Sequence, residues 1–246
     1  MKIPENDENN KQEKHLDFKE IDRFLVEKIC EERKFPYQIQ IHYTKDLSNE
    51  VLKYLQREKT INYFKNEDLS ELNAVALPFE GVGFHIVIDE DKELPATTVI
   101  HEATHIIDYY EFMINFNNGS FDIENNNLYR AFYCYTEFNA RLNAHIFYLK
   151  NLHLQLPKDI ELPDLINLIN QFYSQYANIE MVKDFYKLMQ LLGRWAAIEY
   201  VKNTTYELPH YTGLYEKLVA AKQKINDTTL AELDAEFNKY SLLWYK

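Results

Sequence analysis

The stretch TTVIHEATHIIDYY, residues 97–110, carries the pattern His-Glu-x-x-His inside a segment of helical periodicity. Side chains four positions apart on a helix differ by only about 40° of rotation, so His101 and His105 project together. Neutral imidazole nitrogens bind zinc readily. Glu102 lies about 100° further round, which is too far for a third ligand but suits a hydrogen bond to metal-bound water. The stretch therefore predicts a metal site with Glu102 as its general base.

The opposite side of the same segment is apolar and uninterrupted by proline or glycine. Pro95 is well placed as the first residue of a helix over 95–114. A helix that is buried on one side and faces a cleft with the other is what a preorganised site requires. The alternative is two histidines on a partly exposed helix face. The apolar stripe consists of Val99, Ala103, Ile106, Tyr110 and Met113, and is widened by Ile100 and Ile107.

A catalytic zinc ion needs a third protein ligand, and the continuation of the motif offers no further histidine. The next predicted helix, over 128–151, carries Glu137 on one face with the small residues Ala140 and Ala144, which permit close approach of the two helices. Glu137 is therefore the predicted third ligand. The alternative for Glu137 is a surface ion pair with Arg141, one turn later.

Asp108 lies on the His101/His105 face and is the second choice as a ligand. Its other role would be to accept a hydrogen bond that fixes an imidazole tautomer.

This arrangement resembles the gluzincin zinc metallopeptidases, in which His-Glu-x-x-His is followed by a Glu on the next helix. Over residues 74–150 it is also somewhat similar to the ImmA/IrrE-type intracellular metallopeptidases that cleave repressors. The resemblance implies a zincin-like core, Zn²⁺ held by His101, His105 and Glu137, and VGFHIVID (82–89) as an edge strand that holds extended peptide. Arg141 is a departure, because larger gluzincins often carry an Asp there.

Several other residues have both a functional and a purely structural interpretation. Tyr133 is a candidate donor to the oxyanion, since it lies near the Glu137 face, although packing explains it equally. Other candidate donors are His145 and the pair His210-Tyr211. His85 lines a substrate groove or faces solvent.

A cysteine and two arginines near the predicted site also have both a functional and a structural interpretation. Cys134 is better explained as a small buried hydrophobe than as a ligand. Arg130 and Arg141 form ordinary ion pairs or meet a substrate carboxylate.

Composition excludes several classes of protein. A net charge of −12 disfavours binding driven by nucleic-acid phosphates, and neither GxGxxG nor GxxxxGK[ST] is present. The two cysteines form no CxxC and suit a reducing compartment. The chain begins without an apolar leader, and no run of 18 apolar residues could span a membrane. We expect a cytoplasmic protein with neither nucleic-acid nor membrane partners.

The predicted fold is α+β and predominantly helical, with a small sheet beside the helix of the His-Glu-x-x-His pattern. We expect residues 1–15 to form a disordered tail, 16–155 a zincin-like catalytic core, and 156–246 a helical C-terminal subdomain packed on the core. The predicted helices begin at Asp17 and near 49, 95, 128, 164, 178, 212 and 228, and the predicted strands cover 36–44, 74–79 and 82–89.

The predicted function is zinc-dependent hydrolysis of a peptide or protein substrate. The alternative from another class is a catalytically silent, zincin-like interaction protein whose zinc is structural or absent. A metal-free helical scaffold is a third possibility. Neither the substrate nor the oligomeric state follows from the sequence.

Overall fold

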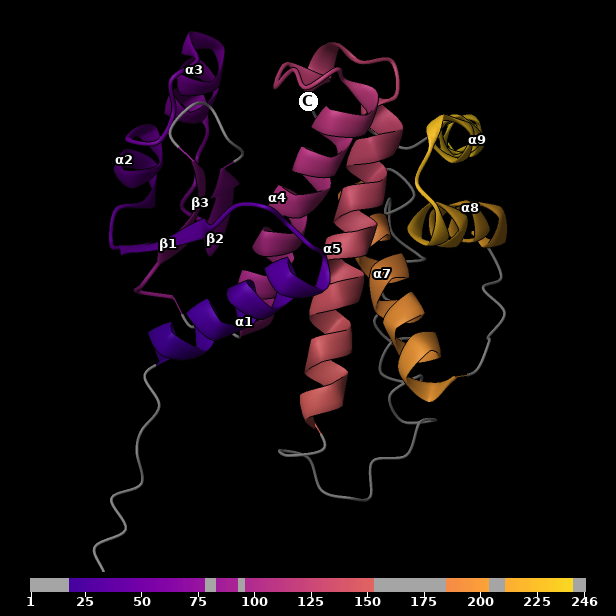
Figure 1. The fold of residues 1–246 in the computed structure, drawn as a ribbon, viewed down its shortest axis with the longest axis horizontal. Coiled ribbons are helices and arrows are strands. Elements are labelled where there is room, and N and C mark those ends of the chain that lie inside the picture. The colour runs from indigo at the N-terminus through magenta and orange to yellow at the C-terminus, as the bar shows by residue number, and fades with distance from the viewer. Residues whose placement is uncertain (1–17, 78–82, 93–95, 153–184, 204–210, 241–246) are drawn as a thin grey trace, which may run out of the picture.

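The computed structural model describes residues 18–77, 83–92, 96–152, 185–203 and 211–240, and within them the fold is α+β and predominantly helical, as predicted (Figure 1). In chain order the elements are α1 (Phe18–Glu32), β1 (Ile39–Thr44), α2 (Leu47–Leu52), α3 (Glu58–Asn66), β2 (Ala74–Leu77), β3 (Phe84–Asp89), α4 (Ala96–Phe116), the 3-10 helix η1 (Ile123–Asn125), α5 (Tyr129–Leu152), α7 (Phe185–Lys202), α8 (Thr212–Gln223) and α9 (Asp227–Phe237).

The three described strands form one mixed sheet with the order β1-β3-β2. β3 pairs parallel with β1 and antiparallel with β2, so both of its edges are occupied. The expectation that residues 82–89 form the edge strand is therefore wrong. The edge strand nearest α4 is β2, a short run of small and aliphatic residues, AVAL.

The sheet is covered on both faces because its strands alternate between two apolar clusters. Phe84, Ile86 and Ile88 of β3 pack with residues of α1 and α4, including Val99 and Ala103. Val87 instead packs with α2 and with β2. The apolar side predicted for the 95–114 helix is thus buried against the sheet.

Helices α4 and α5 run side by side through the middle of the molecule (Figure 1). The predicted bounds of 95–114 and 128–151 differ from the observed ones by at most two residues. Between the two helices the chain reverses at Asn118 and Gly119, which both have positive φ, 50° and 76°. Glycine adopts this conformation without steric cost, which explains the Asn-Gly break.

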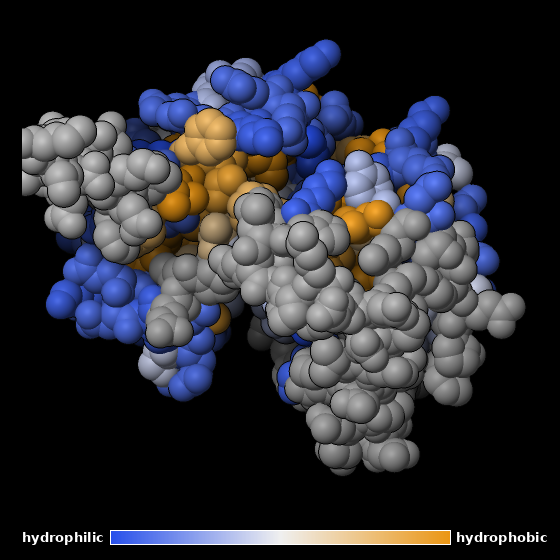
Figure 2. Space-filling model, turned by 90° about the horizontal axis from the view of Figure 1, so that it is seen from below, coloured by the Kyte–Doolittle hydropathy of each residue, from blue (hydrophilic) through white to orange (hydrophobic). Residues whose placement is uncertain are grey.

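The first part of the chain departs from the prediction in two ways. Helical spacing predicts Phe18, Phe24 and Leu25 on the apolar side of α1. Leu25 is buried, together with Asp22 and Val26, but Phe18 and Phe24 are 57% and 63% exposed. Seen from below, the molecule shows apolar surface among the hydrophilic side chains (Figure 2). The helix predicted over 49–57 corresponds to α2, which covers only Leu47–Leu52, and the helix α3 that follows at Glu58–Asn66 was not predicted.

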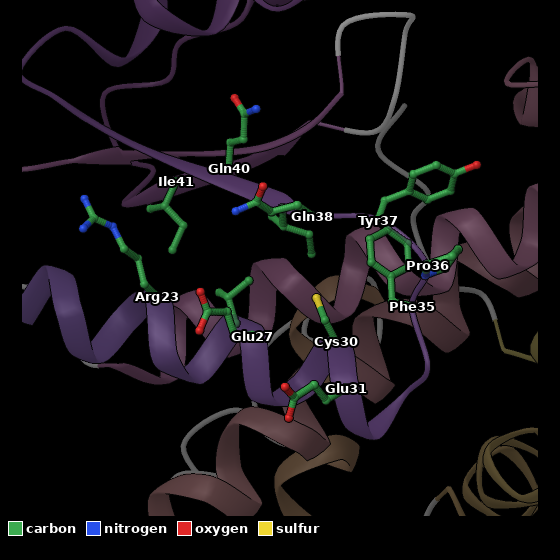
Figure 3. Close-up of a pocket in the computed structure, with 12 residues that line it drawn as sticks. Arg23, Glu27, Cys30, Glu31, Phe35, Pro36, Tyr37, Gln38, Gln40 and Ile41 are labelled. Atoms are coloured by element: carbon green, nitrogen blue, oxygen red, sulfur yellow. The ribbon is translucent and has the colours of Figure 1, made fainter.

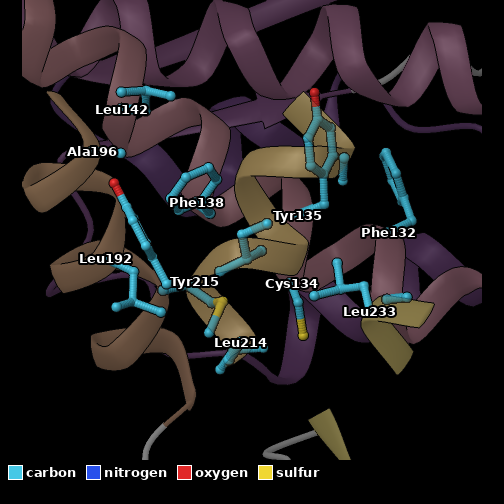
Figure 4. Packing of buried hydrophobic residues seen from close by; sticks show 14 of the residues in the cluster. Phe132, Cys134, Tyr135, Phe138, Leu142, Leu192, Ala196, Leu214, Tyr215 and Leu233 are labelled. Atoms are coloured by element: carbon cyan, nitrogen blue, oxygen red, sulfur yellow. The ribbon is translucent and has the colours of Figure 1, made fainter. Parts of the chain in front are cut away.

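Helices α7, α8 and α9 share one large apolar cluster with α5 (Figure 4). Cys134 is completely buried in this cluster, which supports its interpretation as a small hydrophobe. The helix predicted to begin near 164 and the first residues of the one predicted to begin near 178 lie outside the described residues. The division at 155 remains a prediction. Among the helices of the described ranges, none is both long and apolar enough to cross a bilayer.

Candidate metal centre

Two neighbouring helices bring His101, His105 and Glu137 together. On α4, Nε2 of His101 lies 3.0 Å from Nε2 of His105, because the residues are one turn apart. From α5, Oε2 of Glu137 lies 3.9 Å from Nε2 of His101, and Oε1 lies 3.7 Å from Nε2 of His105. The predicted juxtaposition of these three residues is thus present. All three side chains are at least nine-tenths buried.

The spacing of these atoms suits one shared metal ion. Two atoms that each lie about 2.1 Å from the same ion are at most about 4.2 Å apart, and the three distances above satisfy that limit. One ligand atom from each residue lies within 4.8 Å of the others. Oε2 of Glu137 is also buried without a hydrogen-bond partner in the described chain. Such orphaned buried oxygens are rare in folded proteins, so this group can bind a metal ion.

The tautomer of His105 is set by Thr136, which comes from α5. Nδ1 of His105 lies 2.9 Å from the Thr136 hydroxyl, and that hydroxyl lies 3.1 Å from Oδ2 of Asp108. An ionised carboxylate only accepts hydrogen bonds, so Thr136 donates to Asp108 and accepts from Nδ1–H of His105. The proton on Nδ1 leaves the lone pair on Nε2, the atom that faces Glu137.

Asp108 is a buried acceptor rather than a ligand. It receives bonds from Asn139 Nδ2 at 2.8 and 3.0 Å and an ion pair from Arg33 at 3.0 Å. Arg33 also pairs with Glu111 at 2.8 Å. The predicted second choice of Asp108 as a ligand is wrong for this arrangement, and its tautomer-fixing role acts through Thr136. Arg33, Thr136 and Asn139 were not singled out from the sequence.

Burial favours the neutral form of both imidazoles. It lowers the pKa of His105 to about 4, with the charge of Arg141 acting in the same direction. Burial and the neighbouring His105 also lower the pKa of His101. Because metals bind neutral imidazole, both rings are in the required state at neutral pH.

Glu102 lies beside this group and faces the sheet edge. Burial raises the pKa of Glu102 to about 8, while hydrogen bonding to the backbone N–H of Ala76 in β2 lowers it. Burial and the nearby charge of Glu102 raise the pKa of Glu137, also to about 8. Because the charge of Glu102 reaches Glu137, the two carboxyl groups occupy one small region, as expected for an acid–base pair at a site.

Two tyrosines approach the same region from different helices. The Tyr133 phenol lowers the pKa of Glu137 through hydrogen bonding, so it is engaged with the predicted third ligand. Tyr186 of α7 is raised in pKa by burial and by the charges of Glu137 and Glu102. Tyr186 was not singled out from the sequence.

No family model, curated protein or solved structure matches this chain. The site is therefore interpreted from its own geometry.

The remaining predicted candidates lie elsewhere or do other things. His85 is 3% exposed and points to the α2 side of the sheet, where it is 2.9 Å from His42 and stacks on Tyr54. It therefore neither lines a groove at α4 nor faces solvent. His145 is packed against Tyr148. His210 lies outside the described residues.

A pocket of about 450 Å³ lies away from the metal-binding group, between α1 and the outer edge of β1 (Figure 3). Glu27 and Cys30 of α1 face Gln38 and Ile41 across it. Burial and the charge of Glu27 raise the pKa of the Cys30 thiol to about 11, so it is unreactive at neutral pH.

Proposed function

We propose that this chain is a zinc-dependent peptide hydrolase, in which His101, His105 and Glu137 hold Zn²⁺. The ion would polarise the scissile carbonyl and make water a stronger acid. Glu102 takes a proton from the attacking water and passes it to the leaving amine. The observation that carries the proposal is the group of two imidazoles and an unpartnered, buried carboxylate oxygen, with a second carboxyl group beside it.

The chemistry of the donors favours zinc over a harder cation. Two nitrogens and one carboxylate are typical of catalytic zinc sites, whereas calcium and magnesium prefer oxygen ligands throughout. The Thr136 hydroxyl, which fixes Nδ1–H of His105, supplies the outer hydrogen bond that metal-binding histidines usually have.

No described strand pairs with the outer edge of β2, and this edge supports a peptide substrate. The N–H of Asp89 in β3 donates to the carbonyl of Asn73 at 3.0 Å, so Asn73 faces β3. Backbone groups alternate along an antiparallel strand, which turns those of Ala74 and Ala76 outward, toward Glu102. An extended peptide could pair with this edge as an added strand, with its scissile bond near Glu102. β2 thus takes the role that the resemblance gave to 82–89.

The experiment compares the wild type with Glu137→Ala and Glu102→Gln after purification without added metal. We expect about one zinc per wild-type chain, loss of zinc from Glu137→Ala, and retention in Glu102→Gln. Cleavage of a broad peptide library by Glu102→Gln should fall at least about 100-fold, the usual contribution of a general base. A wild type that takes up no zinc from zinc buffer, or equal cleavage by the wild type and Glu102→Gln, contradicts the proposal.

The second candidate is a catalytically silent interaction protein with a structural metal. The interaction of Glu102 with the Ala76 N–H favours it, because it engages the carboxylate that hydrolysis needs. The same assay separates the two functions. A catalytically silent protein binds zinc whenever His101, His105 and Glu137 are all present. Glu102→Gln then changes neither its zinc content nor its binding to partners.

A further inference from the structure

Arg141 stands one helical turn after Glu137 on α5, and among the described residues no carboxylate pairs with it at salt-bridge distance. Its Nε is buried without a hydrogen-bond partner, and its guanidinium makes no ion pair with any described residue. Arg130 on the same helix provides the contrast, since it pairs with Asp234 at 2.7 Å and with Asn238 at 2.6 Å. Of the two arginines considered from the sequence, only Arg130 forms the ordinary ion pair.

The stem of Arg141 is held in place by the close packing of α5 against α7. A Cβ atom added to Gly193 would lie 2.9 Å from Cβ of Arg141 and 2.6 Å from the carbonyl oxygen of Phe138. Only a glycine therefore allows the helices to approach this closely. The point from which the Arg141 side chain leaves α5 is consequently fixed by this packing.

The positive charge of Arg141 shifts the pKa values of residues throughout the metal-binding group. It lowers the pKa of Glu102 and of Glu137, and it lowers the pKa of His101 and His105. Its guanidinium therefore lies near all four residues while bonding to none of them. Burying a cation without a hydrogen-bonded counter-ion costs free energy, and a bound anion would offset that cost.

We propose that Arg141 binds a carboxylate of the substrate, so that the site selects peptides carrying one next to the scissile bond. This inference rests on the proposed peptide hydrolase. The planar guanidinium donates two parallel hydrogen bonds to a carboxylate, a geometry that an ammonium cannot reproduce. The carboxylate comes either from the C-terminus of a short peptide or from an Asp or Glu side chain.

The test uses three peptide hydroxamates, which bind a site metal directly. One ends in a free carboxylate, one is its C-terminal amide, and one is an amide carrying a Glu side chain. Their dissociation constants are measured calorimetrically on zinc-loaded wild type, Arg141→Gln, Arg141→Lys and the control Arg130→Gln. Zinc content and circular dichroism show whether each variant is folded and loaded.

We expect the wild type and Arg130→Gln to bind at least one carboxylate ligand tenfold or more tightly than the plain amide. The ligand that gains identifies the source of the carboxylate. In Arg141→Gln the ratio should fall to near one, and Arg141→Lys should restore it only in part. The carboxylate role is overturned if the wild type binds all three hydroxamates equally. It is also overturned if Arg141→Gln keeps the full preference for the carboxylate ligand over the plain amide. Both results leave the hydrolase intact, whereas a wild type that binds none of the hydroxamates contradicts the hydrolase as well.

Discussion

The hydroxyl of Thr136 lies 2.9 Å from Nδ1 of His105 and joins this ring to Asp108, 3.1 Å further on. Asp108 is in turn neutralised by Arg33, which lies just after the end of α1. One buried chain of polar groups therefore connects a predicted ligand to the first helix of the fold. Such chains set the orientation and basicity of metal-binding imidazoles.

Replacing Thr136 by Val should weaken zinc binding about 10–100-fold, because Nδ1 of His105 loses its acceptor and Asp108 loses a donor. Competition against a chromophoric chelator measures the affinity. Thr136→Ser, which retains the hydroxyl, is the matched control and should bind zinc nearly as the wild type does. Equal affinity in all three proteins would show that the hydroxyl does not tune the site.

Zinc binding near pH 7 should release protons from Glu137. Burial and Glu102 raise the pKa of Glu137 to about 8 in the metal-free protein, so its carboxyl is largely protonated at pH 7 and must ionise to bind. Proton release should disappear by about pH 9, because Glu137 is then already ionised before zinc binds. Calorimetry in buffers of different ionisation enthalpy counts the protons.

Glu102→Gln is the control for this measurement, because Glu102 also has a raised pKa and could lose a proton when zinc binds. Proton release should persist in Glu102→Gln, because burial still raises the pKa of Glu137, but it should be smaller, because the charge of Glu102 is gone. A pH-independent enthalpy that is the same in every buffer contradicts ionisation of Glu137.

The helices of the site could be predicted because their signals are local. His101 and His105 are fixed relative to each other by one helical turn, and Glu137 could be placed by the small residues sharing its face. The fit of Glu137 to the histidines depends only on two adjacent helices that pack together.

The misplaced features depend on contacts between distant segments. The position of β3 between β1 and β2 follows from a parallel pairing with residues more than 40 positions away, which no local pattern encodes. His85 was assigned to a groove or solvent because alternation gives two faces but does not say that α2 covers the second one. Tyr186 and Arg33 reach the site only through tertiary packing, so nothing in their local sequence marks them.

His145 should make the protein less stable in mild acid. Burial, with the charges of Arg194 and Arg141, lowers the pKa of His145 to about 4 in the folded state, against about 6.5 when unfolded. As the pH falls from 6.5 toward 4, the unfolded chain takes up the proton first, and the folded state loses about 3 kcal/mol of stability. Above pH 6.5 this contribution is fully present.

The variant His145→Gln isolates this effect, because it removes the titrating group and leaves the rest of the chain unchanged. Urea unfolding at pH 4.5, 5.5 and 7 gives the free energy of unfolding for both proteins. As the pH falls, the free energy of unfolding of the wild type should decrease more than that of His145→Gln. A difference that is constant across this range contradicts a lowered pKa for His145.

Gly193→Ala should destabilise the protein by about 1–3 kcal/mol, the usual cost of overpacking. The new methyl group would meet the Phe138 carbonyl oxygen at 2.6 Å, the Arg141 Cβ at 2.9 Å and the Leu142 nitrogen at 3.1 Å. These are atoms of a rigid helix and cannot move aside singly, so α5 and α7 must separate. The shift should also disturb the position of Arg141.

Gly213→Ala is the matched control, because a Cβ at that position would approach only the flexible carboxylate of Glu236. With the side chain turned away, alanine improves helix propensity in α8, so stability should be unchanged or rise by up to about 1 kcal/mol. Thermal unfolding of the two variants beside the wild type measures both effects. If Gly193→Ala were as stable as Gly213→Ala, the close contact of α5 with α7 would not be needed for the fold, and the fixed stem of Arg141 would lose its structural basis.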